Sequence, residues 1–131
     1  MNKFIIEHPG KYNFDKTVDL LVAEAERREW KVPFIHDLQQ SLAKSGKTVK
    51  PVKVIEICKP DYSGQMLELS DERIMSVMMP CRISVYIKDD GKTYIALLDG
   101  AKMAAGQPEN IASVMKAASD ETFEIVKATV L

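Results

Sequence analysis

Two segments decide the predicted fold: Lys50-Pro-Val-Lys-Val-Ile-Glu-Ile-Cys58-Lys-Pro60 and Met78-Met-Pro-Cys81-Arg-Ile-Ser-Val-Tyr86. The first is rich in β-branched residues and ends at a proline, which predicts a buried strand over 52–58. The second alternates apolar and polar residues from its cysteine onward, which predicts a strand over 81–88. If these strands are antiparallel neighbours, the end of one lies beside the start of the other. Both cysteines then lie at the same edge of the sheet.

The composition is typical of a single globular domain. The 131 residues are 46% hydrophobic and 28% charged, without a low-complexity tract or an internal repeat, and a chain of this length needs no disulfide bond to fold. The net charge is −1 and no run of five like charges occurs, so the broad basic face that nucleic-acid binding requires is missing. We expect no nucleic-acid partner.

The apolar segments are too short to cross a membrane. None approaches the roughly 20 residues that span a bilayer, and charged residues follow Met1 too early for a signal peptide. We therefore expect a cytoplasmic protein with no membrane partner. In that reducing compartment the two cysteines of the chain are expected to be free thiols.

The first 50 residues predict two strands and two helices. Asn13 is a suitable N-cap, and apolar residues recur on one face of the helix that follows it. Pro33 places the second strand at a sheet edge, because proline cannot donate to the ladder. The predicted elements are a strand over 3–7, a helix over 14–29, a strand over 30–36 and a short helix from Asp37 to near Gly46.

The connection between the two cysteines is predicted to be helical. Asp61 is a suitable N-cap for a helix over 62–69. A further helical turn begins near Ser70 and must end before Pro80, because proline disfavours helical angles in the residue that precedes it. After the predicted hairpin, a long closing helix begins at Pro108.

The hairpin after the second cysteine has a strong turn signal. Asp90-Gly91 predicts a two-residue type I′ turn, which fixes the register of the two strands. In that register Cys81 belongs to the apolar face, whereas Ile95 and Leu97 lie on the second face, where they favour a homodimer. The expected pairs are Val85 with Ala96 and Ile83 with Leu98.

The order of these elements and one cysteine–proline pattern resemble the bacterial and archaeal domain-of-unknown-function 302 family. The resemblance runs from about residue 4 to residue 126. Its specific part is Cys-x-Pro, followed by Pro-Cys and a hairpin strand, and it is carried here by Cys58, Pro60, Pro80 and Cys81.

The resemblance implies an α+β fold with a mainly antiparallel sheet and helices on one face. The implied order is β-α-β(4)-α, similar to one half of the TATA-binding-protein fold without its nucleic-acid surface, and the implied assembly is a homodimer. No activity is implied, because that of the family is unsettled. The chain departs from the pattern at Lys59, where the family usually has asparagine, and at Met79, where it usually has leucine.

The cysteines allow three interpretations, which remain open. A thiol acts as nucleophile or ligand only as the thiolate, which a helix N-terminus or a nearby cation favours. Cys58 precedes a predicted helix and is followed by Lys59, and Arg82 follows Cys81. The pair could be packed core thiols, a redox or sulfur-handling pair, or ligands of a soft metal or haem. Thioether ligands for a soft metal could come from Met66, Met75, Met78 and Met79.

Other polar residues give weaker signals. His8 and His36 lie next to carboxylates but lack metal-ligand spacing. Glu56 lies within an apolar strand, where it either faces solvent or is buried near the cysteines. No catalytic-triad motif, phosphate loop or dinucleotide fingerprint is present, so no cofactor is indicated.

We therefore predict a small-ligand-binding or redox-responsive module with its site in a groove at the cysteine edge of the sheet. The alternatives are a sulfur carrier or thiol-dependent enzyme, and a structural or partner-binding homodimeric subunit. The residues predicted to form the site are Cys58, Cys81, Pro60, Pro80, Lys59, Arg82 and Met79.

Overall fold

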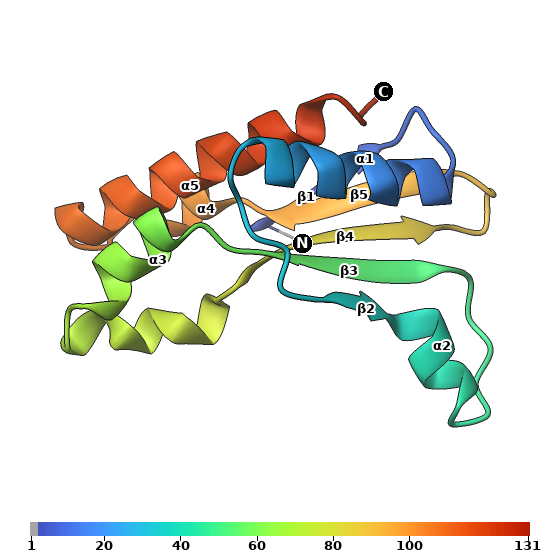
Figure 1. Ribbon diagram of the computed structural model, residues 1–131, viewed down its shortest axis with the longest axis horizontal. Coiled ribbons are helices and arrows are strands. Elements are labelled where there is room, and N and C mark those ends of the chain that lie inside the picture. The colour runs from blue at the N-terminus through green and yellow to red at the C-terminus, as the bar shows by residue number, and fades with distance from the viewer. Residues whose placement is uncertain (1–2) are drawn as a thin grey trace.

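The computed structural model describes residues 3–131 and contains a five-stranded sheet with helices (Figure 1). The strand order is β1-β5-β4-β3-β2, and all neighbouring strands are antiparallel. Among the helices of residues 3–131, none has the length and apolar character that a membrane crossing needs. The elements are β1 (Ile5–Pro9), α1 (Phe14–Arg27), β2 (Ile35–Asp37), α2 (Leu38–Ala43), β3 (Val52–Ile57), α3 (Pro60–Leu67), the 3₁₀ segment η1 (Asp71–Met78), β4 (Cys81–Ile87), β5 (Thr93–Leu98), α4 (Gly100–Met103) and α5 (Glu109–Lys127).

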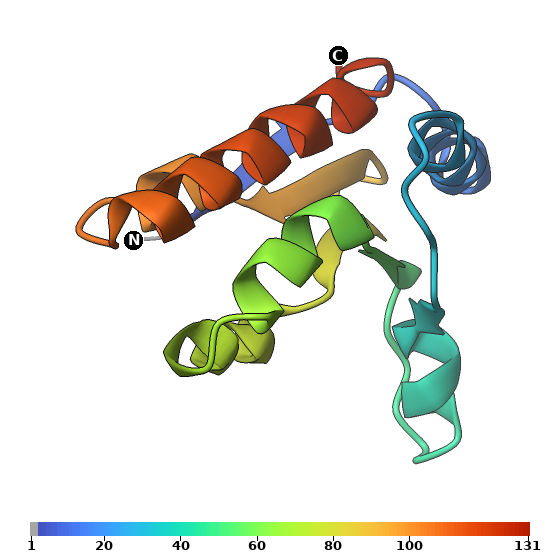
Figure 2. The same ribbon diagram turned by 60° about the vertical axis from the view of Figure 1, so that its left-hand side comes forward.

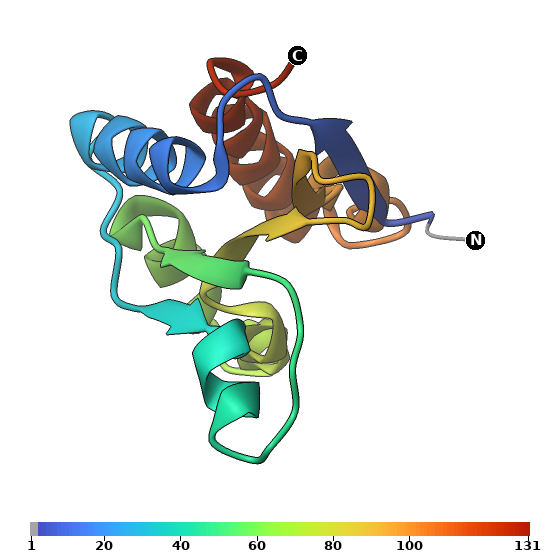
Figure 3. The same ribbon diagram turned by 90° about the vertical axis from the view of Figure 1, so that its right-hand side faces the viewer.

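The predicted α+β fold and the β-α-β(4)-α order are confirmed, with short helices inserted between the strands. The long helices α1 and α5 lie on the same face of the sheet (Figure 3). Alternate residues of the central strands point toward these helices, and their apolar side chains are almost completely buried. This core face of the sheet comprises Ile55, Ile57, Ile83, Val85, Ile95 and Leu97.

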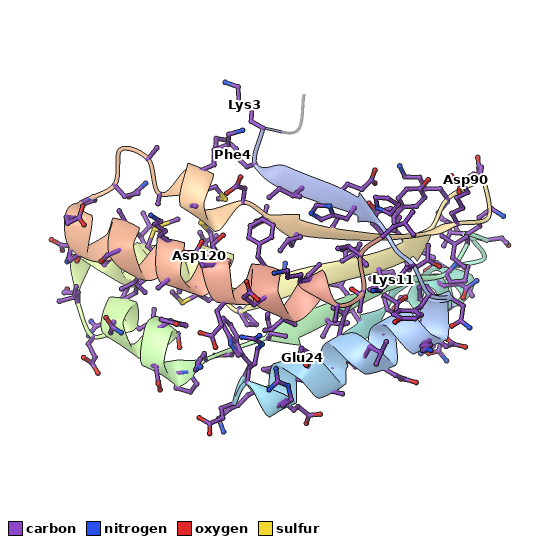
Figure 4. All side chains as sticks on the ribbon, turned by 90° about the horizontal axis from the view of Figure 1, so that it is seen from above. Lys3, Phe4, Lys11, Glu24, Asp90 and Asp120 are labelled. Carbon is purple, nitrogen blue, oxygen red and sulfur yellow. The ribbon has the colours of Figure 1, made fainter. Side chains whose placement is uncertain are left out.

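The two long helices form where the sequence gives them a cap and an apolar stripe. The Asn13 side chain accepts a hydrogen bond from the backbone N–H of Lys16 at 2.8 Å, as expected for an N-cap. α1 buries Val18, Leu21 and Ala25 against the sheet. Seen from above in Figure 4, α5 runs across the strands beside α1, with Glu24 and Asp120 marking the two helices.

The predicted hairpin register is wrong by one residue. Val85 pairs with Ile95, not with Ala96. The turn contains three residues instead of two: the Gly91 N–H donates to the Lys88 carbonyl at 2.9 Å, and Gly91 has a φ of 78°. This is the geometry of a turn followed by a residue in the left-handed region, which glycine adopts without strain.

The corrected register changes the two faces of β5. Ile95 and Leu97 are 0% and 4% exposed and belong to the core face, so they cannot form the outer surface of the hairpin. Leu98 lies on the opposite face, where it pairs with Ile5 of β1, and both side chains are about half exposed. Ile95 and Leu97 were predicted to favour a homodimer, and this placement is wrong because both side chains are buried in the core.

A second apolar cluster lies beyond the end of the sheet. It joins α3, α4 and the first half of α5, and in Figure 2 α3 and η1 lie at this end while α2 projects from the other. The N-cap of α3 is Lys59, with Pro60 in the first turn, so the predicted cap at Asp61 is wrong. The buried residues of the cluster are Met66, Ala104, Ile111, Val114 and Met115.

Candidate functional site

The two cysteines lie at one edge of the sheet, at the junction of the two apolar clusters. β3 and β4 are antiparallel neighbours, as predicted, and Ile57 is directly opposite Cys81. Cys58 follows Ile57 and forms a bridge with Lys31 beyond the end of β3. Both cysteines line the same small cavity of about 60 Å³, beside Tyr62. The end of β3 thus lies beside the start of β4, as predicted, and both cysteines line this cavity.

The environment of the thiols does not activate Cys81. Both cysteines are free thiols. Burial and the neighbouring Cys58 raise the pKa of the Cys81 thiol, so its thiolate is scarcer at neutral pH than that of an exposed cysteine. The Cys58 sulfur lies 3.7 Å from the Ser63 hydroxyl, at the start of α3. Neither sulfur is paired with a cation among these contacts.

Of the other predicted site residues, Lys59, Met79 and Pro80 lie with the cysteines at the small cavity, whereas Pro60 and Arg82 do not line it. Met79 and Pro80 line the small cavity and also a larger one next to it. Pro60 is exposed at the start of α3. Lys59 also lines the small cavity, and its ammonium forms an ion pair with Glu121 at 2.7 Å. Arg82 lies on the face of β4 opposite Cys81, in register with Glu56, and also lines the larger cavity at the end of the strand.

The larger cavity has a volume of about 250 Å³ and lies between η1, the ends of β4 and β5, α4 and α5. Its lining is mostly apolar. Six of the seven methionines of the chain line it, and the seventh, Met1, lies outside the described residues. The lining residues are Met66, Met75, Val77, Met78, Met79, Pro80, Cys81, Arg82, Leu97, Leu98, Gly100, Met103, Met115, Ala118, Ser119 and Thr122.

One polar atom in the wall of this cavity has no partner. The Ser119 side chain is 7% exposed, and within residues 3–131 its Oγ forms no hydrogen bond. Thr122, which also lines the cavity, donates from its hydroxyl to the Ala118 carbonyl at 2.8 Å. Buried hydroxyls are normally satisfied in this way, so the Ser119 hydroxyl is available to a bound molecule.

Close packing of α4 on α5 shapes the wall around Ser119. A Cβ at Gly100 would lie 3.0 Å from the Ser119 Cβ and 3.3 Å from the Met115 carbonyl oxygen. Any larger residue there would require its neighbours to move by a few tenths of an ångström, because these contacts are shorter than ordinary van der Waals distances. The first residue of α4 is thus held directly against α5, beside the unpartnered hydroxyl.

A partly buried carboxylate in α5 connects three distant segments. Glu121 accepts hydrogen bonds from the Trp30 indole at 2.8 Å, the Lys59 ammonium at 2.7 Å and the Tyr62 hydroxyl at 2.6 Å. Burial raises the pKa of Glu121, but the hydrogen bonds from Lys59, Tyr62 and Trp30 together outweigh it and lower the pKa. The hydrogen bond to Glu121, with burial, raises the pKa of Tyr62 to about 12. All donors are satisfied, so this network is structural.

The uncovered face of the sheet carries a second set of polar contacts. His36 Nε2 lies 2.7 Å from Glu56 Oε2, so the Glu56 carboxylate on β3, whose side chain is only 14% exposed, is paired across to β2. Glu7 accepts hydrogen bonds from Lys88 at 2.8 Å and from the Tyr86 hydroxyl. Those two hydrogen bonds lower the pKa of Glu7. These groups are mutually satisfied and form no pocket with the cysteines.

The site residues that sequence reasoning missed come from distant parts of the chain. Met103, Met115 and Ser119 lie in α4 and α5, outside the segment between the cysteines. The only sequence signal for Met103 and Met115 was the accumulation of methionine, which is a minor core residue in most domains, and Ser119 gave no signal. In the range 3–131, no three side chains among His, Cys, Asp and Glu gather closely enough to hold a metal ion. A soft metal at this edge would therefore need methionine sulfur.

The fold and the site define a two-layer α+β domain with a ligand-sized, methionine-lined cavity at one end of its sheet. The profile of the domain of unknown function DUF302 matches residues 6–129, and the chain belongs to this family. The fold is similar to the crystal structure of an uncharacterized conserved DUF302 protein from Bacillus stearothermophilus, with a TM-score of 0.84 and 14% sequence identity. That alignment covers 95% of this chain and 97% of the other. A comparison with curated proteins gives no match.

Proposed function

We propose that this domain binds a small, largely apolar ligand in the methionine-lined cavity beside Cys81. The observation that supports this most is the combination of a 250 Å³ cavity with apolar walls and one buried, unpartnered hydroxyl, that of Ser119. Ligand sites typically combine apolar walls with a few polar groups that orient the ligand. Typical ligand pockets have roughly 300–1,000 Å³, so a compact ligand fits this one best.

Methionine is well suited to line such a cavity. Its side chain is unbranched and polarizable, so it adapts to ligands of different shape at small energetic cost. η1 contributes Met75 and Met78, and its other apolar side chains are unusually exposed: Ile74 is 75% exposed and Val77 is 85% exposed. Val77 also lines the cavity. Apolar side chains at the rim are a feature of ligand entrances and of interaction surfaces.

Titration with the neutral fluorescent probe N-phenyl-1-naphthylamine tests the proposal. We expect saturable binding of one probe per chain, with a dissociation constant below about 0.2 mM, the value that about −0.3 kcal/mol per non-hydrogen atom gives for this probe. The proposal would be contradicted if probe fluorescence showed no saturable increase with wild-type protein at probe concentrations above about 0.2 mM.

A thiol-based function is the second candidate, supported by the position of Cys81 in the walls of both cavities. A sulfur carrier would use one cysteine covalently, and a redox-responsive domain would use the pair. The raised pKa of Cys81 disfavours it as the attacking group at neutral pH. Rapid reaction of one native thiol with a disulfide reagent at pH 7 would favour this candidate, whereas reaction only above pH 9 or after denaturation would favour ligand binding.

We also propose a homodimer, on grounds that do not involve Ile95 and Leu97. The exposed side chains Ile74 and Val77 of η1, together with the half-exposed Leu98 and Ile5, supply apolar surface outside the core. Contact between two copies would remove that surface from water. Sedimentation of a dimer at micromolar concentration would support this assembly, and a monomer at the same concentration would contradict it.

A further inference from the structure

A single charged residue lines the methionine-lined cavity. Arg82 is the only Lys, Arg, Asp or Glu in its wall, among the residues that the structure describes. Arg82 is exposed and lies at the start of β4, next to Cys81. The cavity therefore combines an apolar interior with one positive charge.

The Arg82 guanidinium has no competing partner within residues 3–131. Glu56 is opposite Arg82 in the β3–β4 register, but the Glu56 carboxylate is hydrogen bonded to His36 at 2.7 Å. No carboxylate of the described chain forms an ion pair with Arg82. By contrast, Arg27 and Arg28 both pair with Glu24 in α1. Arg82 is thus available to an anion from outside the chain.

We propose that the ligand of this cavity is a small amphiphilic carboxylate. Its apolar body packs among the methionines, its carboxylate pairs with the Arg82 guanidinium, and the Ser119 hydroxyl hydrogen bonds to one further polar atom where the ligand has one. The planar guanidinium matches a carboxylate in a bidentate geometry, which favours an anion over a neutral polar group. This inference rests on the proposed function, since it requires that the cavity bind a ligand at all.

The overall charge of the chain does not favour anion binding. The net charge is −1, so a preference for an anion has to come from a local positive group. The apolar walls reject a small inorganic anion such as sulfate, because desolvating it there is costly. An apolar body and a negative charge are both required.

Competition between three ligands of equal length tests the proposal. Octanoate, octanol and octylammonium are each used to displace N-phenyl-1-naphthylamine, below the concentrations at which they form micelles. Charge-assisted hydrogen bonds to Arg82 should let octanoate displace the probe at about tenfold lower concentration than octanol. Octylammonium should be the weakest competitor, because it places a second positive charge beside Arg82.

Three variants test whether Arg82 causes the preference for octanoate over octanol. Arg82→Gln should make octanoate and octanol equal competitors, each measured against the variant's own affinity for the probe. Arg27→Gln also removes one arginine charge, but from the exposed side of α1, and should keep the wild-type preference. Ser119→Ala should keep it as well, because the hydroxyl carries no charge.

The outcomes separate this inference from the proposed function. If the probe binds and the three ligands compete equally, the carboxylate assignment is overturned and the apolar cavity site stands. If Arg82→Gln retains the preference for octanoate, the assignment to Arg82 is overturned. If the probe itself does not bind, the proposed function fails, and the inference fails with it.

Discussion

Replacing Glu121 with alanine is expected to lower the free energy of unfolding by about 2–4 kcal/mol, the range for breaking a charged, largely buried hydrogen-bond network. The variant leaves the Trp30 indole N–H without its acceptor and leaves the Lys59 ammonium with only the Arg28 carbonyl, and both groups are mostly buried. Since Glu121 joins α5 to α3 and to the segment after α1, the loss should affect global unfolding. Urea denaturation followed by Trp30 fluorescence measures it.

Glu124→Ala is the matched control on the same helix. Glu124 is 51% exposed, and its oxygen lies 3.9 Å from the Arg28 guanidinium. Exposed ion pairs contribute about 0–1 kcal/mol, so this variant should unfold almost as the wild type does. Equal losses for Glu121→Ala and Glu124→Ala would contradict a structural role of the buried network.

The Glu121 network also predicts a dependence on acid. The pKa of Glu121 is lower in the folded protein than its ordinary value of 4.5. The stability that it contributes is therefore fully present above pH 4.5 and is lost as the pH falls through the folded pKa. The difference between wild type and Glu121→Gln should narrow below pH 4.5, which urea unfolding at pH 7 and pH 3.5 can measure.

Filling the larger cavity is the second change with a large expected effect. Ala118 lies on α5 and lines both cavities, so the ring of Ala118→Phe should occupy the space proposed for the ligand. Burying one aromatic ring contributes about 1.5–3 kcal/mol. If the probe loses that contribution, its binding weakens by about 10- to 100-fold. Thermal unfolding should stay cooperative, because the added ring fills existing space.

Ala117→Phe is the control for this variant. Ala117 precedes Ala118 on α5 but lines neither cavity. It should therefore keep the wild-type affinity for the probe. If Ala118→Phe folds and binds the probe as tightly as the wild type, the probe occupies another part of the surface and the cavity is not the site.

The sequence predicted the central strand pair because its signals are local. β-branched residues over 52–58 and strict alternation from Cys81 determine two strands, and the prolines 60 and 80 determine where they end and begin. Antiparallel pairing of those strands then puts both cysteines at the same end of the strand pair. The pairing of these two strands can be predicted without knowing how the helices pack.

The hairpin register could not be read from Asp90-Gly91 alone. A glycine with positive φ fits both the last position of a three-residue loop and a two-residue turn, and the two differ by one residue. Burial of Ile95 and Leu97 against α1 and α5 decides between them, because the other register would expose both side chains. That deciding contact is tertiary.

The larger cavity was beyond prediction for a related reason. Its wall combines β4 with residues of α4 and α5, and an empty volume depends on how closely helices approach one another. That approach is governed by contacts such as Gly100 against Ser119. The residues between the cysteines indicated the correct end of the sheet, whereas Ser119 gave no signal, since a serine in an amphipathic helix is commonplace.

Nuclear magnetic resonance of methionine methyl groups tests the central claim most directly. With the methyl carbons labelled, titration with N-phenyl-1-naphthylamine should shift the resonances of the cavity methionines, with Met103 and Met115 assigned by single Met→Leu variants. These are the side chains in the cavity wall on α4 and α5. The shifts should saturate at the same probe concentration as the fluorescence. Saturable probe binding with these methionine resonances unmoved would contradict the claim that the cavity is the ligand site.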